Sequence, residues 1–384
     1  MIISLAYLIL FLSILGIAHT YLIYPITLTL FSSAKKRDSK INTELKVGIL
    51  IAAYNEEKVI GEKLESIFKN DYPAGNIQVF IGSDASTDKT NSIIESYIKK
   101  HPNLKLIPFE GRTGKAAIIN KLAELCDSEI FILTDANVIF ETNTISSLVK
   151  HFSDDAVKLV AANIQKVSDK SINIQPIEKK YLNLENKIKS LESNNWDLVI
   201  GAEGGCYAIR KTSYHPVPKN YFMDDFYITM SVLNKGGKVL FEEDAVCYED
   251  LPSESSEEFK RKVRISIGNY QNLSAFNHLL WPPWEPLGYA FLSHKVLRWI
   301  TPFLLMAVYG SSLILSFESR GFLLFTLLQF IGFASPIFIK QLKHVKPLLF
   351  IAHFYNMNYA LLKGFFIYLK GVKSSVWEPT KRHA

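Results

Sequence analysis

The sequence predicts an α/β domain, with a mostly parallel sheet sandwiched between helices, carried by transmembrane helices at both ends. Between about residues 46 and 163, short β-branched runs alternate with helical stretches, a rhythm typical of parallel sheets with helical crossovers. Residues 1–34 contain no Asp, Glu, Lys or Arg, and further apolar stretches follow residue 298. The 384-residue chain is 48% hydrophobic, which is high for a purely soluble protein.

The alternation places the elements of the first half of the sheet in order. Apolar runs of strand length are separated by amphipathic stretches that end at turn residues. The predicted elements are a strand at Val47–Ala53, a helix at Glu56–Lys69, a strand at Gln78–Gly82, a helix at Thr87–Lys100, a strand at Leu104–Pro108, a helix at Lys115–Leu125 and a strand at Ile130–Thr134.

The second half of the domain is less regular. A polar segment at 166–196 is predicted to be helical in part, and glycines lead into a strand at Cys206–Ile209. Asp224–Lys235 is predicted to be a helix that Gly236 and Gly237 end. Residues 254–280 are amphipathic, and the tryptophans at 281–284 are of the kind found at the lipid headgroup level.

The N-terminal apolar segment is predicted to be a retained anchor. Residues 1–34 exceed the roughly 20 apolar residues that span a bilayer, and they lack the basic start of a signal peptide. Basic residues at 35–37 and 40 follow directly, so the positive-inside rule places the N-terminus outside and the domain in the cytoplasm of a multi-pass inner or plasma membrane protein. The net charge of +6 favours contact with anionic lipid rather than nucleic acid.

Three apolar stretches follow the domain, at 299–317, 321–339 and 347–369. The first two are predicted spans. The third contains Asn356, Asn358 and Lys363, and a mid-membrane Lys costs about 2.5–3.5 kcal/mol, so crossing, re-entrant and in-plane placements stay open. The predicted divisions are an anchor at 1–34, a catalytic domain at 45–250, interface helices at 251–295, a transmembrane region at 296–371 and a basic tail at 372–384.

Polar residues follow the strands of the predicted sheet at their carboxyl ends, where open α/β sheets bind ligands. These are Tyr54 to Glu56, Asp84, and Asp135 with Asn137. The oxygens of Asp135 and Asn137 suit a Mg²⁺ or Mn²⁺ ion shared with a diphosphate. A turn or a helix cap is the alternative explanation for each of these residues.

Three charged features extend this candidate site. Lys115 stands at a helix start in a segment that is not a Walker loop, where it could bind an anion or be solvated. The adjacent carboxylates of Asp224 and Asp225 would cap a helix or, by raising one pKa, supply a general base. Arg261 and Arg264 share a helical face and could neutralise a diphosphate or bind lipid headgroups. The three cysteines are too scattered to predict a disulfide framework or a zinc site.

Together these residues resemble glycosyltransferase family 2, the inverting membrane enzymes that include cellulose, hyaluronan and poly-N-acetylglucosamine synthases. The resemblance covers about residues 47–273. The matching motifs are Tyr54-Asn55-Glu56 (P-x-Y-N-E, with Ala52 at the proline), Ser83 to Asp88 (D-D-G-S-T-D), Gly114-Lys115-Ala116 with Asn120 (G-K-A-x-x-x-N), Asp135-Ala136-Asn137 (D-x-D), Met223-Asp224-Asp225 (T-E-D) and Arg261 to Ile265 (Q-x-x-R-W).

The resemblance implies a GT-A-type fold and transfer of a sugar, with a UDP-sugar as the expected donor, to a glycan or lipid-linked acceptor. It implies Asp225 as the base, assisted by Asp224, Arg261 and Arg264. It implies donor binding by Ala53, Tyr54, Glu56, Asp84, Lys115, Asp135 and Ala136, acceptor binding by Gly204, Gly205 and Cys206, and a divalent cation on Asp135 and Asn137.

Departures from the family's motifs leave two questions open. Ile265 replaces the tryptophan of Q-x-x-R-W, which slightly favours single-sugar transfer over processive synthesis. Ser83, Asn137 and Ile265 together also permit a catalytically inactive scaffold that binds a nucleotide within a synthase complex.

Overall fold

The computed structural model describes residues 1–32, 42–167, 175–250, 255–339, 341–342 and 345–372. The chain divides into two compact units. One comprises the described residues between 32 and 253 and contains the sheet. The other comprises Met1–Phe31 and Glu254–Gly371 and is helical. The basic residues at 35–37 and 40, and most of the predicted basic tail, lie outside the described residues.

The sheet has eight strands in the order β3-β2-β1-β4-β7-β6-β8-β5. The strands are β1 Val47–Ala53, β2 Ile77–Ser83, β3 Leu104–Pro108, β4 Ile130–Thr134, β5 Val138–Phe140, β6 Val157–Val167, β7 Cys206–Arg210 and β8 Lys238–Asp250. Parallel pairs join β1 to β2 and β4, β2 to β3, and β6 to β8. Antiparallel pairs join β7 to β4 and β6, and β5 to β8. The sheet is therefore mixed but mostly parallel, as predicted.

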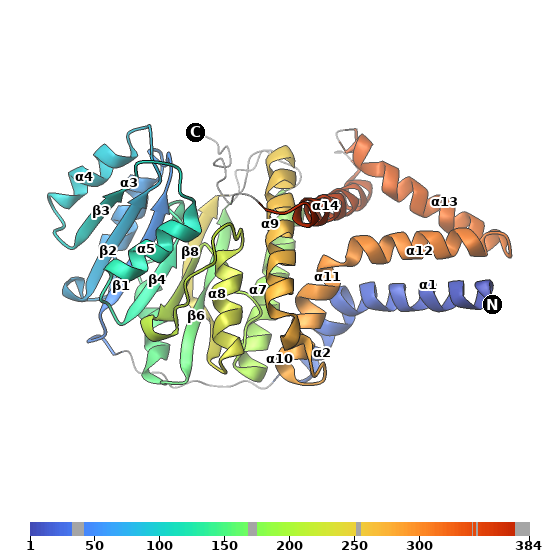
Figure 1. Ribbon diagram of the computed structural model, residues 1–384, viewed down its shortest axis with the longest axis horizontal. Coiled ribbons are helices and arrows are strands. Elements are labelled where there is room, and N and C mark those ends of the chain that lie inside the picture. The colour runs from blue at the N-terminus through green and yellow to red at the C-terminus, as the bar shows by residue number, and fades with distance from the viewer. Residues whose placement is uncertain (33–41, 168–174, 251–254, 340, 343–344, 373–384) are drawn as a thin grey trace. The chain divides into compact units, whose positions relative to one another are not determined.

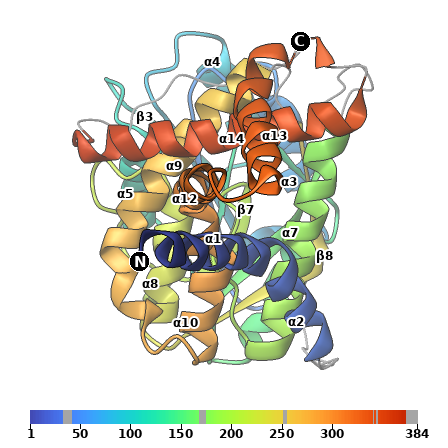
Figure 2. The ribbon, with the colours of Figure 1, turned by 90° about the vertical axis from the view of Figure 1, so that its right-hand side faces the viewer.

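Helices cover both faces of this sheet. They are α3 Ile60–Phe68, α4 Thr90–Ile98, α5 Lys115–Leu125, α6 Thr144–Val149, α7 Gln175–Trp196 and α8 Asp224–Asn234. Figures 1 and 2 show α5 and α8 on the side opposite α3. A Cβ added at Gly82 would lie 2.3 Å from Ile118 Cγ2, so only glycine lets α5 approach β2 this closely.

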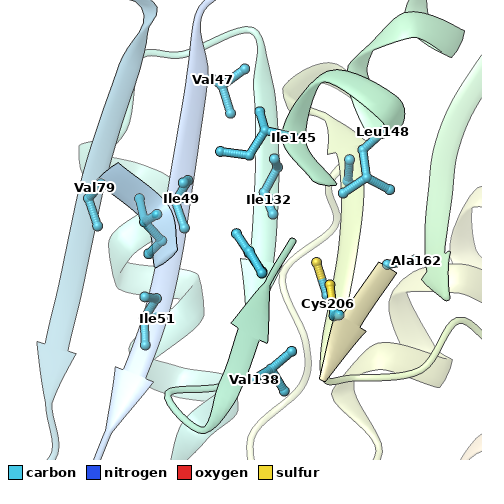
Figure 3. Close-up of a cluster of buried hydrophobic side chains, with 14 of the residues drawn as sticks. Val47, Ile49, Ile51, Val79, Ile132, Val138, Ile145, Leu148, Ala162 and Cys206 are labelled. Atoms are coloured by element: carbon cyan, nitrogen blue, oxygen red, sulfur yellow. The ribbon is translucent and has the colours of Figure 1, made fainter. Parts of the chain in front are cut away.

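The core on the α3 face is built from alternate strand residues. Val47, Ile49 and Ile51 of β1 share this face, because successive side chains of a strand point to opposite faces, and all three are fully buried. They pack in one cluster with apolar residues of α3 and α6, which Figure 3 shows for Ile145 and Leu148. All three cysteines are free and buried, and Cys206 belongs to this cluster.

Two helices begin later than the sequence predicts. α3 begins at Ile60 rather than at Glu56, and α4 at Thr90 rather than at Thr87. Asn55 has a φ of 53°, and its Oδ1 accepts a hydrogen bond from Thr87 N at 2.8 Å. The amide of Glu56 donates to Thr90 Oγ1 at 2.8 Å. These side chains hold the two loops after β1 and β2 together and keep their backbone out of the helices.

The helical unit contains α1 Ile2–Ala18, α2 Tyr24–Leu30, α9 Ser255–Phe276, α10 Pro286–Ala290, α11 Leu297–Trp299, α12 Thr301–Leu315, α13 Arg320–Ala334 and α14 Lys346–Leu369. α1 packs along α12 through Ala6, Leu10, Val308 and Leu315. Ser266 Oγ of α9 donates to Leu361 O of α14 at 2.7 Å. Gly364 makes this approach possible, because a Cβ there would lie 2.3 Å from Ser266 Cβ.

Two stretches among the described residues are long and apolar enough to cross a membrane, Ile2–Leu30 and Arg320–Phe338. A third arises if Pro286–Trp299 and Thr301–Leu315, bent by 64°, form one span. In that case the first predicted C-terminal span would extend back into the predicted interface segment. Helix α14, the third predicted stretch, is not one of these candidates.

Candidate active site

The polar loops after β1 and β2 meet at the carboxyl edge of the sheet. Ala53 and Ser83 end neighbouring parallel strands in register, and Asp84 N donates to Ala53 O at 2.8 Å. Ala53 is buried, so its main chain is the part of it that a ligand could contact. Glu56 lies in the next turn, where its amide is bonded to Thr90.

Asp84 binds the loop before α5. Its carboxylate accepts hydrogen bonds from Thr113 N at 2.5 Å and Gly114 N at 3.2 Å, and from Arg112 Nε at 3.1 Å. The Arg112 guanidinium lies 3.4 Å from the centroid of the Tyr54 ring, a cation–π contact. Asp88, not Asp84, accepts from the first amide of α4, Thr90 N, at 2.9 Å. The structure thus brings Tyr54 and Asp84 together through Arg112.

Lys115 connects the end of β4 to the start of α8. Its Nζ lies 2.7 Å from Asp135 Oδ1 and 3.7 Å from Asp224 Oδ2. Gly114, with a φ of 88°, caps α5 and turns Lys115 into its first position. Burial opposes ionisation of Lys115, but the carboxylates of Asp135, Asp224 and Asp225 outweigh it and raise the pKa of Lys115 well above its usual value. A permanent cation therefore stands among these acids.

Asp225 has the electrostatics of a general base. It follows Asp224 at the start of α8, and burial, followed by the neighbouring Asp224 charge, raises the pKa of Asp225 to about 7. Its Oδ1 accepts a hydrogen bond from Phe226 N at 2.8 Å. A carboxylate that titrates near neutral pH can both accept a proton and be ionised when substrate arrives.

The glycine loop before β7 lies against this carboxylate. Gly201 has a φ of 86°, and Ala202 N donates to Thr229 Oγ1 of α8 at 3.1 Å. A Cβ at Gly204 would lie 2.7 Å from Asp225 Oδ2. Gly205 O accepts from Asp135 N at 3.1 Å. The loop thereby touches both Asp135 and Asp225.

Cys206, the third residue predicted to bind acceptor, faces away from the loop. Its side chain is fully buried in the hydrophobic core on the α3 face. The side chain of Ala136 is buried as well. Both residues can offer a ligand main-chain atoms only.

Replacing Gly204 with Ala is expected to lower kcat about 10-fold or more, because the new Cβ displaces Asp225 Oδ2 while Phe226 N holds Oδ1. Nucleotide affinity should change little. Steady-state kinetics with nucleotide titration would check this. Gly75→Ala is the matched control, because a Cβ at Gly75 meets nothing within 4 Å; equal kinetics for the two variants would contradict the close approach.

The possible metal donors are one carboxylate and one amide. Among the described residues, no three His, Cys, Asp or Glu side chains form a metal-binding group. Asn137 is buried, and its Nδ2 donates to Glu249 Oε1 at 3.4 Å, which leaves Oδ1 as the coordinating atom. One or two protein oxygens fit a Mg²⁺-type ion that takes its other ligands from substrate phosphates and water.

The two arginines predicted to act on the diphosphate belong to the helical unit. Arg261 and Arg264 lie on α9, on either side of the buried Val263. Their role toward the diphosphate stays a prediction.

Two residues near the site carried no sequence signal. Arg112 lies in a loop and contacts both Asp84 and Tyr54. These residues are far apart in the sequence, so only the folded structure identifies the contact. Lys63 lies buried under Thr134, although a lysine in an amphipathic helix is ordinarily solvated.

Comparison with known proteins identifies the family of this domain. Residues 48–216 match the family model described as Glycosyl transferase family 2; Asp224, Asp225 and the arginines lie beyond the match. A beta-monoglucosyldiacylglycerol synthase of Nostoc sp. is 32% identical over 116 residues, 30% of this chain and 25% of that protein. A poly-beta-1,6-N-acetyl-D-glucosamine synthase of Staphylococcus epidermidis is 22% identical over 234 residues, 59% of this chain and 55% of that protein.

A solved structure shares the fold over nearly the whole chain. The mannosyltransferase of Pyrobaculum calidifontis in complex with GDP-Man and Mn²⁺ superposes with a TM-score of 0.72 and 20% identity, covering 96% of this chain and 99% of that one. The predicted GT-A-type sheet with apolar helices at both ends is thereby confirmed, whereas the chain spans only a quarter to about half of the two curated relatives. The sheet domain of this chain therefore belongs to glycosyltransferase family 2.

Proposed function

We propose that this protein is an inverting membrane glycosyltransferase that moves a sugar from a nucleotide sugar to a glycan or lipid-linked acceptor. The observation that carries this proposal is the position of Lys115, 2.7 Å from Asp135 and 3.7 Å from Asp224. Lys115, a cation for the diphosphate, thus lies beside Asp224, and the next residue, Asp225, has a raised pKa that suits a base. The catalytic domain would face the cytoplasm of the plasma or inner membrane, where nucleotide sugars are made.

The proposed reaction is a single displacement at the anomeric carbon. Asp225 removes the proton of the acceptor hydroxyl while that oxygen forms the new glycosidic bond. The bond from the anomeric carbon to the diphosphate oxygen breaks, and the nucleoside diphosphate leaves with the electron pair. Lys115 neutralises the charge that develops there, and the same role is proposed for Arg261 and Arg264. Attack opposite the leaving group inverts the configuration.

Asp135 and Asn137 would hold a Mg²⁺ or Mn²⁺ ion. Such an ion supplies Lewis-acid stabilisation of the leaving diphosphate. Lys115 already lies on Asp135 Oδ1, so the other carboxylate oxygen is the one open to a metal. The Mn²⁺ in the Pyrobaculum structure supports the use of a divalent cation.

The curated relatives suggest two classes of acceptor. The Nostoc relative is named for a diacylglycerol lipid and the staphylococcal relative for a polysaccharide. Helices able to cross a membrane suit either acceptor. The expected donor is a UDP-sugar. Because the structural relative was solved with GDP-Man, GDP-sugars should be tested beside UDP-sugars.

A donor panel tests the function. Membranes that contain the full chain are incubated with UDP- and GDP-sugars and Mn²⁺ or Mg²⁺, and released nucleotide and product mass are measured. We expect release with one donor class, inhibition by chelator, and a product one sugar larger than its acceptor or a polymer. Nucleotide binding without release from any donor would contradict the proposal and favour the inactive scaffold, which Ser83, Asn137 and Ile265 permit.

A further inference from the structure

Lys63 is a buried cation directly beneath the carboxyl edge of the sheet. It lies on α3 with 0% exposure, between Ile60 and Ile67, which are also fully buried. Among the described residues, no carboxylate lies within ion-pair distance of its Nζ. Burial lowers the pKa of Lys63 to about 8, against the opposing effect of Cys206, Cys247 and Asp135. A lysine in such a place reduces stability unless its ammonium is bonded.

The ammonium of Lys63 bonds to both ends of the turn at residues 135–137, which carries the proposed metal donors. Lys63 Nζ donates to Thr134 Oγ1 at 3.0 Å and to Val138 O at 2.5 Å. Thr134 and Val138 flank the three residues from Asp135 to Asn137. Nζ also lies 3.4 Å from the centroid of the Phe140 ring in β5, a cation–π contact. One side chain thus fixes where β4 ends and where β5 begins.

The same hydroxyl continues to the glycine loop. Thr134 Oγ1 accepts from Lys63 and donates to Gly205 O at 2.8 Å. Gly205 O also accepts from Asp135 N at 3.1 Å. Gly204, the preceding residue, touches Asp225. An unbroken chain of contacts therefore runs from Lys63 through Thr134 and the glycine loop to the proposed base.

We propose that Lys63 is a positioning residue, which sets the Asp135–Asn137 turn and the 201–205 loop relative to each other so that donor and base are aligned. The inference rests on the proposed function for its catalytic consequence, while the positioning itself is a property of the fold. Misplacing reacting groups by about 1 Å can lower a rate 10²-fold. An apolar residue at this position would avoid the cost of burying a charge. Buried charges of this kind are expected mainly at functional sites.

Lys63→Met keeps the length of the side chain and removes the ammonium. In the full-length protein we expect faster amide hydrogen exchange at 134–138 and at 201–206, and a fall in kcat of about 10- to 100-fold. Thr134→Val breaks the same chain of bonds without changing charge, and should accelerate exchange at 201–206. Leu64→Met is the control, a volume-conserving change at the adjacent buried position, and should leave both readouts within about 2-fold.

The double variants separate positioning from general destabilisation. Lys63→Met with Thr134→Val should lose no more kcat than the worse single variant, because both substitutions break the same chain of bonds. Multiplying effects for the Lys63 pair, or unchanged exchange at both segments, would overturn the inference. If Lys63→Met does not fold, Thr134→Val decides by itself. If the wild type transfers no sugar, the proposed function fails, and the exchange measurements still decide the role of Lys63.

Discussion

Asp225→Asn is expected to abolish sugar transfer while nucleotide affinity stays within a few-fold of wild type. A positioned general base contributes about 10²- to 10⁴-fold to rate, and the amide cannot accept the proton. The side chain keeps its shape against Gly204 and its bond to Phe226 N. Turnover is measured as nucleoside diphosphate release with the active donor, and affinity by calorimetric titration.

Asp155→Asn is the control for this variant, because Asp155 is an almost fully exposed carboxylate at 99% side-chain exposure. It should behave as wild type. Wild-type turnover by Asp225→Asn would remove Asp225 from the proposed mechanism, and lost nucleotide affinity would indicate a structural defect instead.

The raised pKa of Asp225 gives this variant a second, pH-dependent signature. Because the pKa rises on folding from 3.8 to about 7, the stability that the protonated carboxyl contributes is present at low pH and is lost as pH rises through about 7. Asn has no such loss. We expect Asp225→Asn to raise Tm more at about pH 8 than at about pH 5, and wild-type activity to rise with pH near 7.

Asp135→Ala is expected to lower kcat/KM on the order of 10²-fold or more, the size of losing one strong electrostatic group. It removes a proposed metal oxygen and leaves the Lys115 ammonium without its 2.7 Å partner. Titration with Mn²⁺ and nucleoside diphosphate, followed by paramagnetic resonance, should show weakened formation of the ternary complex. Chelator should abolish wild-type turnover and have little further effect on the variant.

Asp127→Ala is the matched control, since Asp127 also pairs with a lysine but is fully exposed. It should keep activity and metal binding. A variant at Asp135 that binds Mn²⁺ and nucleotide as tightly as wild type would exclude Asp135 as a metal ligand.

The regular elements were predictable because each depends on local sequence. β1, β3, β4 and α5 have the predicted bounds, since apolar runs and a glycine cap specify them directly. The starts of α3 and α4 were not predictable, because Asn55 and Thr90 bond to residues more than 30 positions away. Such contacts between loops leave no periodic pattern.

The candidate site follows the same division. The acids and Lys115 could be selected because they follow strands and begin helices, and family resemblance gave them roles. The positions of the Asp84 and Cys206 side chains could not be predicted, because they depend on tertiary contacts. Asp84 binds the loop before α5, and Cys206 turns into the core. The sequence around Lys63 predicts an ordinary solvated lysine on a helix. Its burial appears only in the structure, where α3 packs on the sheet.

Strand β7 has a consequence for how this domain folds. It inserts between β4 and β6, and its residues follow β4 by about 70 positions, as the 71-residue separation of Thr134 and Gly205 shows. Such distant pairing is entropically costly and forms late. During synthesis the parallel strands β1 to β4 emerge first and can associate as a unit. The proposed site, which needs the glycine loop beside Asp135, can therefore form only after β7 has paired with β4 and β6.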